Sequence, residues 1–330
     1  MSGFEFPSRD ARALDLLCLG RAGVDLYAQQ EGTALDAVAG FRKSVGGSAA
    51  NVATGAARLG LRTGMLSVVS DDGFGRYVRG FLAESGVDVR GVKTDGSGAL
   101  NSLAITEVRP DDCKVIIYRR DAADLQLRPQ DIDAAQLRSA RALFVTGTAL
   151  SASPSREASL HAMTLARSAG TVVVLDMDYR PYGWASAAQA SVYLRVACAM
   201  ADIVIGNREE FDVLDLQDST SGAGAQRLLE GVTRCVVVKD GARGCRVLRR
   251  GAAPIEQGVF AVRTRKPFGA GDAFAAAALW GLLDGRAWDE AARLGAAAAA
   301  IVVSGDGCAE AMPSRAALLA FIAEHRTATP

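Results

Sequence analysis

Residues 269–272, Gly-Ala-Gly-Asp, place three small residues and a carboxylate where a helix is expected to begin. Small or apolar residues follow on one helical face, at positions 274, 277, 278, 281 and 282. The main-chain N–H groups of Gly269, Ala270 and Gly271 are therefore predicted to bind an oxyanion at the helix N-terminus. Asp272 either complements the helix dipole as a first-turn acid or acts as the general base of a phosphoryl transfer, and we favour the base.

A glycine pair, Gly46-Gly47, precedes a second predicted helix that begins near Ser48. Paired glycines let a ligand approach the main chain, and the helix N-terminus favours anions and polar oxygens. The motif extends to Asn51, after which apolar residues continue on one helical face. An ordinary loop capped by Ser48 is the alternative, and the local sequence leaves the two interpretations evenly matched.

Further polar residues follow short apolar runs that we interpret as strands, and open α/β sheets bind ligands at such strand ends. These residues are Arg180 after 172–175, Asn207 and Glu210 after 203–205, and Lys239, Gly241 and Gly244 after 235–238. The arginine is suited to clamp a carboxylate or phosphate. Locally, Asn207 and Glu210 favour a capping box. The segment 239–244 is either a β-turn or a ligand loop.

The elements that must position these residues alternate along the chain. Six short apolar runs predict buried strands at 14–19, 64–69, 142–145, 172–175, 203–205 and 235–238. Amphipathic segments lie between them, so we expect an α/β fold whose mainly parallel sheet is covered on both faces. Residues 99–119 break the alternation with two extended segments joined by a turn at 109–112, which predicts a hairpin standing off the main sheet. Residues 24–45 interrupt the alternation in a similar way. We expect one large domain, 1–330.

Composition excludes several classes of function. The 330 residues include 37 Lys+Arg and 37 Asp+Glu, and this neutrality argues against a nucleic-acid partner. Six scattered cysteines without a C-x-x-C pair and only two histidines argue against zinc and histidine-dependent mechanisms. No Walker A motif or complete dinucleotide fingerprint occurs. Without a leader peptide or a long apolar run, the chain is expected to be soluble, cytoplasmic and without a membrane partner, with local positive charge at its site.

Taken together, the motifs resemble the two signatures of the ribokinase-like (PfkB) family of sugar kinases. The resemblance is carried by Gly46-Gly47-x-x-x-Asn51 running into Arg58-Leu59-Gly60, and by Gly269-Ala270-Gly271-Asp272-x-Phe274. Asn207-x-x-Glu210 and Lys239-x-Gly241-x-x-Gly244 fall where the family has intermediate motifs, so the resemblance covers nearly the whole chain. Segments 19–27, 176–184 and 265–268 resemble members that phosphorylate keto-deoxy sugar acids.

The resemblance implies a role for each site residue. Asp272 would take the proton from the substrate's primary hydroxyl, and residues 269–271 would form the anion hole for the transferring phosphoryl group. Groups that hold sugar hydroxyls would be Asp25, Gly46, Gly47 and Asn51. Groups near the substrate carboxylate would be Arg119 and Arg180. Groups on the phosphate side of ATP would be Asn207, Lys239, Gly241 and Gly244. Glu210 would position Mg²⁺ through water.

The resemblance also implies a ribokinase-like three-layer sandwich with a small β lid formed by segments of about 24–45 and 99–121. The lid excludes water and is often a dimer contact, so a homodimer is expected. Nearest alternatives are 2-keto-3-deoxygluconate kinases and other sugar kinases such as fructokinase or ribokinase. A non-catalytic sugar-binding regulator on the same fold is a different class, and the intact Asp272 argues against it.

Two positions depart from the family's pattern. Many members carry an aspartate run before Gly-Ala-Gly-Asp that helps to build a monovalent-cation site, and Lys266-Pro267-Phe268 stands there in this chain. Lys266 either replaces the charge of the cation or is a solvated lysine. The loop at 304–308 falls where the family closes over adenine.

Overall fold

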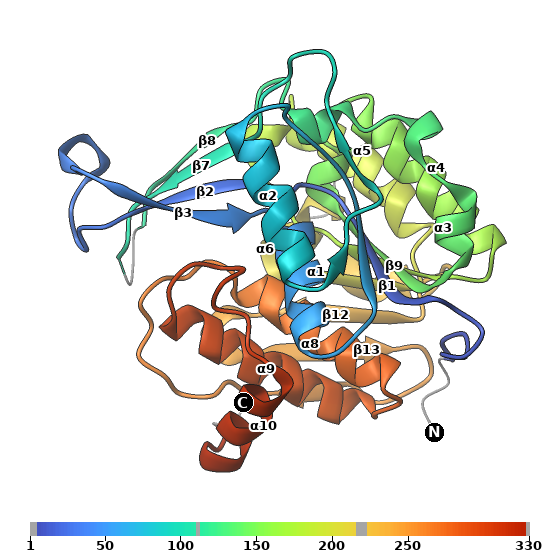
Figure 1. Cartoon of the computed structure of the whole chain (residues 1–330). Helices are drawn as coiled ribbons and strands as arrows, with labels where there is room; N and C mark the ends of the chain where they lie inside the picture. Colours follow the sequence, from blue (N-terminus) through green and yellow to red (C-terminus); the bar gives the residue numbers. More distant parts are fainter. Residues whose placement is uncertain (1–4, 110–112, 216–222, 328–330) are drawn as a thin grey trace.

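The computed structural model describes residues 5–109, 113–215 and 223–327. Within them a ten-stranded sheet runs in the order β14-β13-β12-β11-β10-β9-β1-β4-β5, with β6 paired to β4 (Figure 1). Only the pairs β12–β13 and β13–β14 of this sheet are antiparallel. The strands are β1 Leu14–Leu19, β4 Thr63–Val69, β5 Val87–Asp88, β6 Val92–Thr94, β9 Ala140–Thr146, β10 Val172–Asp176, β11 Ile203–Asn207, β12 Cys235–Lys239, β13 Cys245–Arg249 and β14 Ile255–Gln257.

The six predicted strands are confirmed as β1, β4, β9, β10, β11 and β12, each within two residues of its expected limits. They read as continuous apolar runs because both faces of a parallel sheet are covered. In β1, Leu16 and Cys18 belong to the core on one face, and Leu17 and Leu19 to the core on the other.

Helices cover both faces and make three layers (Figure 1). One face carries α1 Ser48–Arg58, α2 Gly73–Glu84, α8 Ala270–Leu283, α9 Trp288–Ser304 and α10 Arg315–Glu324. The other face carries α3 Ala134–Arg138, α4 Ser155–Ser168, α5 Ala187–Cys198, α6 Arg208–Asp212 and α7 Ala223–Leu228. The expected three-layer α/β sandwich is therefore confirmed. None of the described helices has the length and apolar character needed to cross a membrane.

A second sheet of four strands, in the order β3-β2-β7-β8, extends away from the layers (Figure 1). Its strands are β2 Gly23–Ala28, β3 Phe41–Gly46, β7 Leu103–Thr106 and β8 Val115–Tyr118. The hairpin expected at 99–119 is confirmed as β7 and β8, while residues 110–112 of its predicted turn lie outside the described residues. We call this second sheet the lid.

Residues 24–45 contain most of β2 and β3, as expected for a lid segment, although the local sequence does not identify the two strands. The reason lies in the burial of β3, whose first three residues, 41–43, are exposed while the next three are buried. A strand that changes from exposed to buried along its length lacks the alternation by which strands are recognised in a sequence.

Helix α8 is held rigidly because nearly all of it is buried. Residues 273–283 are all buried, and the helix packs against α1 and α9. Alanines make up much of this segment, and their small side chains let the three helices approach closely. The N-terminal turn of α8, which carries Asp272, is thereby fixed relative to the sheet.

Candidate active site

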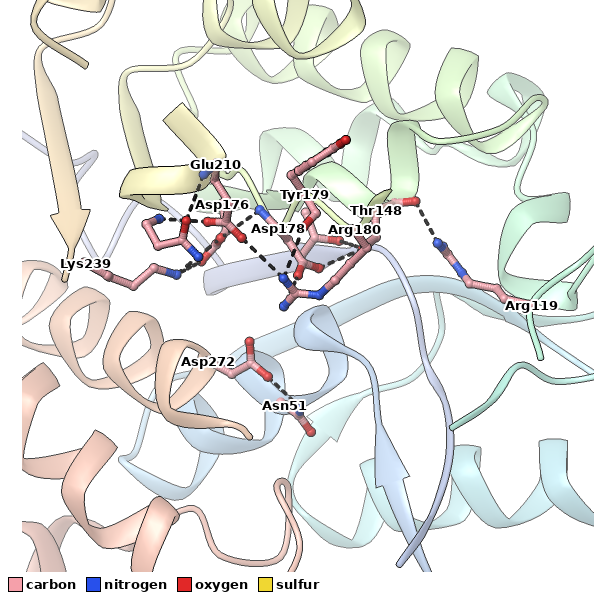
Figure 2. Close-up of polar contacts among 12 residues, drawn as sticks. Asn51, Arg119, Thr148, Asp176, Asp178, Tyr179, Arg180, Glu210, Lys239 and Asp272 are labelled. Carbon is pink, nitrogen blue, oxygen red and sulfur yellow. Dashed lines mark hydrogen bonds and ion pairs between the residues drawn. The ribbon is translucent and has the colours of Figure 1, made fainter. Parts of the chain in front are cut away.

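Nearly all the predicted site residues line two cavities at the carboxyl edge of the large sheet, next to the lid. Figure 2 shows several of them, among them Asn51, Lys239 and Asp272. Strands β10, β11 and β12 end at Asp176, Asn207 and Lys239 respectively. The N-termini of α1 and α8 bring Asn51 and Asp272 to the same place. Segments far apart in the sequence thus converge because parallel strands end at one edge.

Two cavities share a wall at this edge. The larger, of about 640 Å³, lies along the ends of β11 and β12, and the smaller, of about 240 Å³, lies under the lid. Residues that line both are Asp178, Arg180, Phe268, Gly269 and Asp272. Asp272 therefore stands where a molecule in one cavity meets a molecule in the other.

The smaller cavity holds five of the six residues that the sequence assigns to the substrate: Asp25, Gly47, Asn51, Arg119 and Arg180. Strands β2, β7 and β8 of the lid form its wall with Asp25, Tyr27, Ala104, Thr106, Val115 and Ile117. Gly46 does not line the cavity, and its assignment to the substrate stays a prediction. A Cβ on Gly46 would lie 1.9 Å from Oδ1 of Asp25, so the glycine makes room for that carboxylate.

The larger cavity holds all the residues that the sequence assigns to the nucleotide side: Asn207, Glu210, Lys239, Gly241 and Gly244. Its apolar lining includes Val259, Val262, Ala296, Ala299, Ala300 and Val303. The loop at 304–308, expected over adenine, does not line it. Cys308 of that loop lines the smaller cavity instead, and its Sγ lies 3.0 Å from the hydroxyl of Tyr27.

Asp272 accepts a hydrogen bond from Nδ2 of Asn51 at its Oδ2, over 2.7 Å (Figure 2). Burial, followed by the negative charge of Asp178, raises the pKa of Asp272 to about 6, although the hydrogen bond from Asn51 acts in the opposite direction. Oδ1 of Asn51 is buried and accepts no hydrogen bond from the described residues. The pair thus combines a carboxylate of raised basicity with a free amide oxygen.

The N-terminal turn of α8 is open to an anion. Gly269 has φ +84°, a left-handed conformation, and a Cβ there would lie 2.9 Å from Sγ of Cys308. Lys239 reaches the same turn, because a Cβ on Gly271 would lie 3.1 Å from its Nζ. An ammonium group and a helix N-terminus therefore face the same point.

The side chains of Lys239 and Arg180 lie among three buried carboxylates (Figure 2). These belong to Asp176, Asp178 and Glu210. Nζ of Lys239 lies 3.1 Å from Oδ2 of Asp176. Nη2 of Arg180 lies 2.9 Å from Oδ1 of Asp178, and Nη1 lies 3.4 Å from Oε1 of Glu210. Burial is the largest influence on Glu210 and raises its pKa to about 7.

The capping box favoured by the sequence at the start of α6 is present. The main-chain N–H of Glu210 donates to Oδ1 of Asn207, and the N–H of Asn207 donates to Oε2 of Glu210, each over 2.8 Å. Both side chains nevertheless line the larger cavity. A structural role and a place in the site are compatible here, because a helix cap stands at the end of a strand.

The prediction of a locally basic site is wrong for the described residues. The smaller cavity is lined by Arg21, Arg119 and Arg180 but also by Asp25, Asp178 and Asp272. Its cations have acidic partners because an unpaired buried charge is costly. Asp178 was passed over in the sequence, and its unusual φ of +33° is one that no sequence pattern predicts.

Arg21 is the arginine that sequence reasoning missed. Its Nε donates to Oγ of Ser102 over 2.8 Å, and its Nη2 lies 3.2 Å from Oδ1 of Asp25. Arg119 is more firmly held, since it pairs with Asp124 over 2.6 Å and donates to the carbonyl oxygen of Thr148. The signal for Arg21 was present, because this residue follows β1 within the segment 19–27 that carries part of the resemblance.

The model of the pfkB family of carbohydrate kinases matches residues 13–315, nearly the whole chain. The chain belongs to this family. It is a carbohydrate kinase, as the signatures of the two glycine-rich helix starts predicted. A 5-dehydro-2-deoxygluconokinase of Photobacterium profundum is 48% identical over 315 residues, which cover 94% of this chain and 95% of that protein.

Solved structures of sugar kinases superpose on this pfkB chain. Fructokinase of Xylella fastidiosa with bound ATP has a TM-score of 0.83 and 28% identity, and the match covers 94% of this chain and 98% of that one. A putative ribokinase II of E. coli in complex with ATP and Mg²⁺ has a TM-score of 0.87, with coverage of 94% and 100%. Because the identity to the putative ribokinase II is only 23%, this similarity establishes a shared fold and nothing about function.

Proposed function

We propose that the protein transfers the terminal phosphoryl group of ATP to the primary hydroxyl of 5-dehydro-2-deoxy-D-gluconate, a six-carbon keto-deoxy sugar acid. One observation carries the chemistry: Asp272 lies on the wall shared by a large cavity and a small one. The choice of substrate rests on the activity for which the 48% identical relative is named, and on the arginines of the smaller cavity.

Asp272 acts as the general base. A carboxylate with a pKa of about 6 is ionised at neutral pH and holds a proton more strongly than an ordinary aspartate does. As the substrate oxygen attacks phosphorus, its proton passes to Asp272, an O–P bond forms, and the bond from the γ-phosphorus to the bridging oxygen of ADP breaks. The hydrogen bond from Asn51 fixes Oδ2 and leaves Oδ1 to face the substrate.

The start of α8 stabilises the phosphoryl group in transit. The N–H groups of Gly269, Ala270 and Gly271 and the helix dipole face the charge that develops on the equatorial oxygens. Lys239 adds a positive charge beside Gly271. Because the turn is fixed by the packing of α8, these donors need no rearrangement when the charge moves.

ATP fits the larger cavity, whose apolar residues of α9 suit a base and whose strand ends suit the phosphates. Asn207, Lys239, Gly241 and Gly244 line the phosphate side. Glu210 offers the hard oxygen donor that Mg²⁺ prefers, and its bonds to Asn207 and Arg180 suit contact through water. When bound, Mg²⁺ neutralises phosphate charge, which the acidic side chains of this edge cannot do.

The carboxylate of the substrate is assigned to the arginines that line the smaller cavity. Arg180, whose side chain is 45% exposed, is free to exchange part of its contact with Glu210 for a substrate oxygen. Arg119 and Arg21 hold the cavity's shape through Asp124, Ser102 and Asp25. Asp25 also accepts a hydrogen bond from Tyr27 and is suited to bind a sugar hydroxyl.

A substrate panel tests the proposal. ADP release is measured with 5-dehydro-2-deoxy-D-gluconate, 2-keto-3-deoxygluconate, fructose and ribose, and NMR locates the phosphate on the product. We expect the highest kcat/KM and phosphorylation at C6 with the first compound. If 2-keto-3-deoxygluconate or a neutral sugar has a higher kcat/KM, that compound replaces 5-dehydro-2-deoxy-D-gluconate as the substrate. Binding of a sugar without ADP release from any of them would favour the non-catalytic regulator.

A further inference from the structure

Lys266 is a buried lysine that the proposed chemistry does not use. The residue is only 3% exposed. Lysines are rarely buried in this way unless a carboxylate pairs with them. Nζ donates to the main-chain oxygen of Phe268 over 3.0 Å and to that of Val302 over 3.1 Å. The ion pairs found among the described residues include none of Lys266. Its charge is therefore held by two carbonyl groups.

Such an arrangement costs free energy, which suggests that the charge has a function. Taking an ammonium group out of water costs several kcal/mol, on the order given for buried ions, and carbonyl dipoles recover only part of it. The titratable groups that act on Lys266 from its surroundings are the thiol of Cys308 and the carboxyl groups of Asp306, Asp272 and Asp25. Burial nonetheless lowers the pKa of its ammonium below the ordinary value. A buried cation of this kind is more typical of a functional site than of a core.

The two carbonyl groups come from segments that must meet for the anion hole to form. Phe268 immediately precedes Gly269, and both line the two cavities. Val302 lies in the last turn of α9, where main-chain carbonyl oxygens attract a cation, and its oxygen also accepts a hydrogen bond from the N–H of Gly305 over 3.2 Å. The two segments are also in contact at Gly269, where a Cβ would lie 3.0 Å from Cγ1 of Val302. The ammonium thus joins the end of α9 to the entrance of α8.

We propose that Lys266 is a built-in cation that positions the turn 268–271 for phosphoryl transfer, so that the enzyme needs no bound monovalent cation there. The inference rests on the proposed function of that turn as the anion hole. Lys266 is a positioning residue, since its Nζ bonds to the main chain of the turn and the reacting atoms are held by others. Carbonyl oxygens that hold an ammonium group are also the ligands that K⁺ accepts.

The test compares the wild-type kinase with Lys266→Ala, which opens a space for an ion, and Lys266→Met, which fills that space without charge. ADP release is measured in choline chloride with increasing K⁺ or NH₄⁺. We expect the wild-type rate to be the same in all salts. Lys266→Ala should lose roughly 10²-fold in kcat in choline, as for a misplaced reacting group, and regain much of it with K⁺ or NH₄⁺. Lys266→Met should lose activity without recovery.

The exposed Lys93→Ala serves as the matched control and should behave as wild type. A wild-type rate that rises several-fold with K⁺ would overturn the proposal without any variant. Near-normal turnover of Lys266→Ala in choline, or a folded Lys266→Ala that no cation rescues, would also overturn it.

Thermal unfolding separates this inference from the proposed substrate, because it needs no turnover. K⁺ or NH₄⁺ should raise the Tm of Lys266→Ala and leave that of wild type and Lys266→Met unchanged. If no tested sugar releases ADP but this cation dependence of Tm is found, the substrate assignment fails and the cation role of Lys266 stands. Equal Tm responses of all three proteins would refute the cation role.

Discussion

Asp272 differs from an exposed aspartate in what surrounds it. Burial and the neighbouring carboxylate of Asp178 make its ionised form less favourable, so the group becomes a better proton acceptor. The same surroundings would protonate it in mild acid. Because the pKa of Glu210 is also raised, to about 7, two carboxylates of the site change charge between mildly acidic and neutral pH.

We predict that kcat/KM falls as pH drops through the range from about 7 to about 6. In this range Glu210 takes up a proton first and loses the negative charge that pairs with Arg180. Asp272 then takes up a proton and can no longer act as the base. The pH profile of wild type should therefore fall more steeply than one proton allows. Glu210→Gln should leave a one-proton limb near pH 6. A profile that stays flat to pH 5 would contradict the base assignment.

Replacing Arg180 should separate acidic from neutral substrates. A charge-assisted hydrogen bond contributes about 1.5–3 kcal/mol, so Arg180→Gln should lower kcat/KM for the sugar acid by roughly ten- to a hundredfold. The kcat/KM for fructose should change little. The exposed Arg90→Gln is the control. Equal losses for acid and neutral sugar would show that Arg180 does not bind the carboxylate.

Among single residues, the sequence predicted those whose role follows from a local pattern. The glycine-rich helix starts gave Asp272, Asn51 and their neighbours, because small residues before a helix indicate an anion site on their own. Arg21 was not predicted because its place in the site depends on its contact with Asp25. Asp178 was not predicted because an unusual main-chain conformation holds it beside Arg180.

At the scale of elements, a buried ion cluster joins the amino ends of β1 and its two neighbours, β4 and β9. Asp15 of β1 accepts hydrogen bonds from Arg62 over 3.0 Å and from Arg141 over 3.2 Å. Burial by itself would raise the pKa of Asp15, but the hydrogen bonds outweigh it and lower the pKa to about 2. The cluster lies at the edge opposite to the active site.

Asp15→Asn should destabilise the fold and leave the chemistry intact. Breaking a buried ion pair costs about 3–5 kcal/mol, because it leaves uncompensated charge. Chemical denaturation at pH 7 should show this loss, with kcat unchanged below the new Tm. Since its folded pKa is lowered, Asp15 stabilises above pH 4, and its contribution disappears as pH falls through about 2. Unchanged stability at pH 7 would mean that the cluster contributes nothing.

Regular strands were predictable and the lid strands were less so. Strands β1 and β10 are apolar throughout because helices cover both faces, which the sequence displays directly. Strand β3 pairs only with β2 of the described strands and is partly exposed, so its sequence shows mixed polarity. The register and the closure of the lid over the smaller cavity depend on tertiary contacts that no local pattern encodes.

At the scale of the whole molecule, the C-terminal loop joins the lid to the layers. The side chain of Glu310 accepts hydrogen bonds from the main-chain N–H of Val45 and the hydroxyl of Ser44, both in β3. Arg58 of α1 donates to the main-chain oxygen of the same glutamate. Tyr27 in β2 contacts Cys308 of the loop. The C-terminal loop thus contacts both the lid and the C-terminal end of α1.

The homodimer expected through the lid stays a prediction. Exposed residues on the outer face of β8 offer a way to test it. Val115 and Ile117 line the smaller cavity, while Ile116 and Tyr118 alternate with them and are 45% and 58% exposed. Light scattering should give twice the 34.4 kDa of one chain. Ile116→Glu should shift the mass toward one chain, with Glu84→Gln on α2 as control. A monomeric wild type would exclude the dimer.

The account depends most directly on Asp272, and Asp272→Asn tests it with a side chain of the same shape. Turnover with ATP and 5-dehydro-2-deoxy-D-gluconate should fall about 10²–10⁴-fold, the range for loss of a general base. The Kd for ATP should stay near that of wild type. The variant should remain folded, because asparagine still accepts the hydrogen bond from Asn51. Turnover close to that of wild type would contradict the assignment of Asp272 as the base.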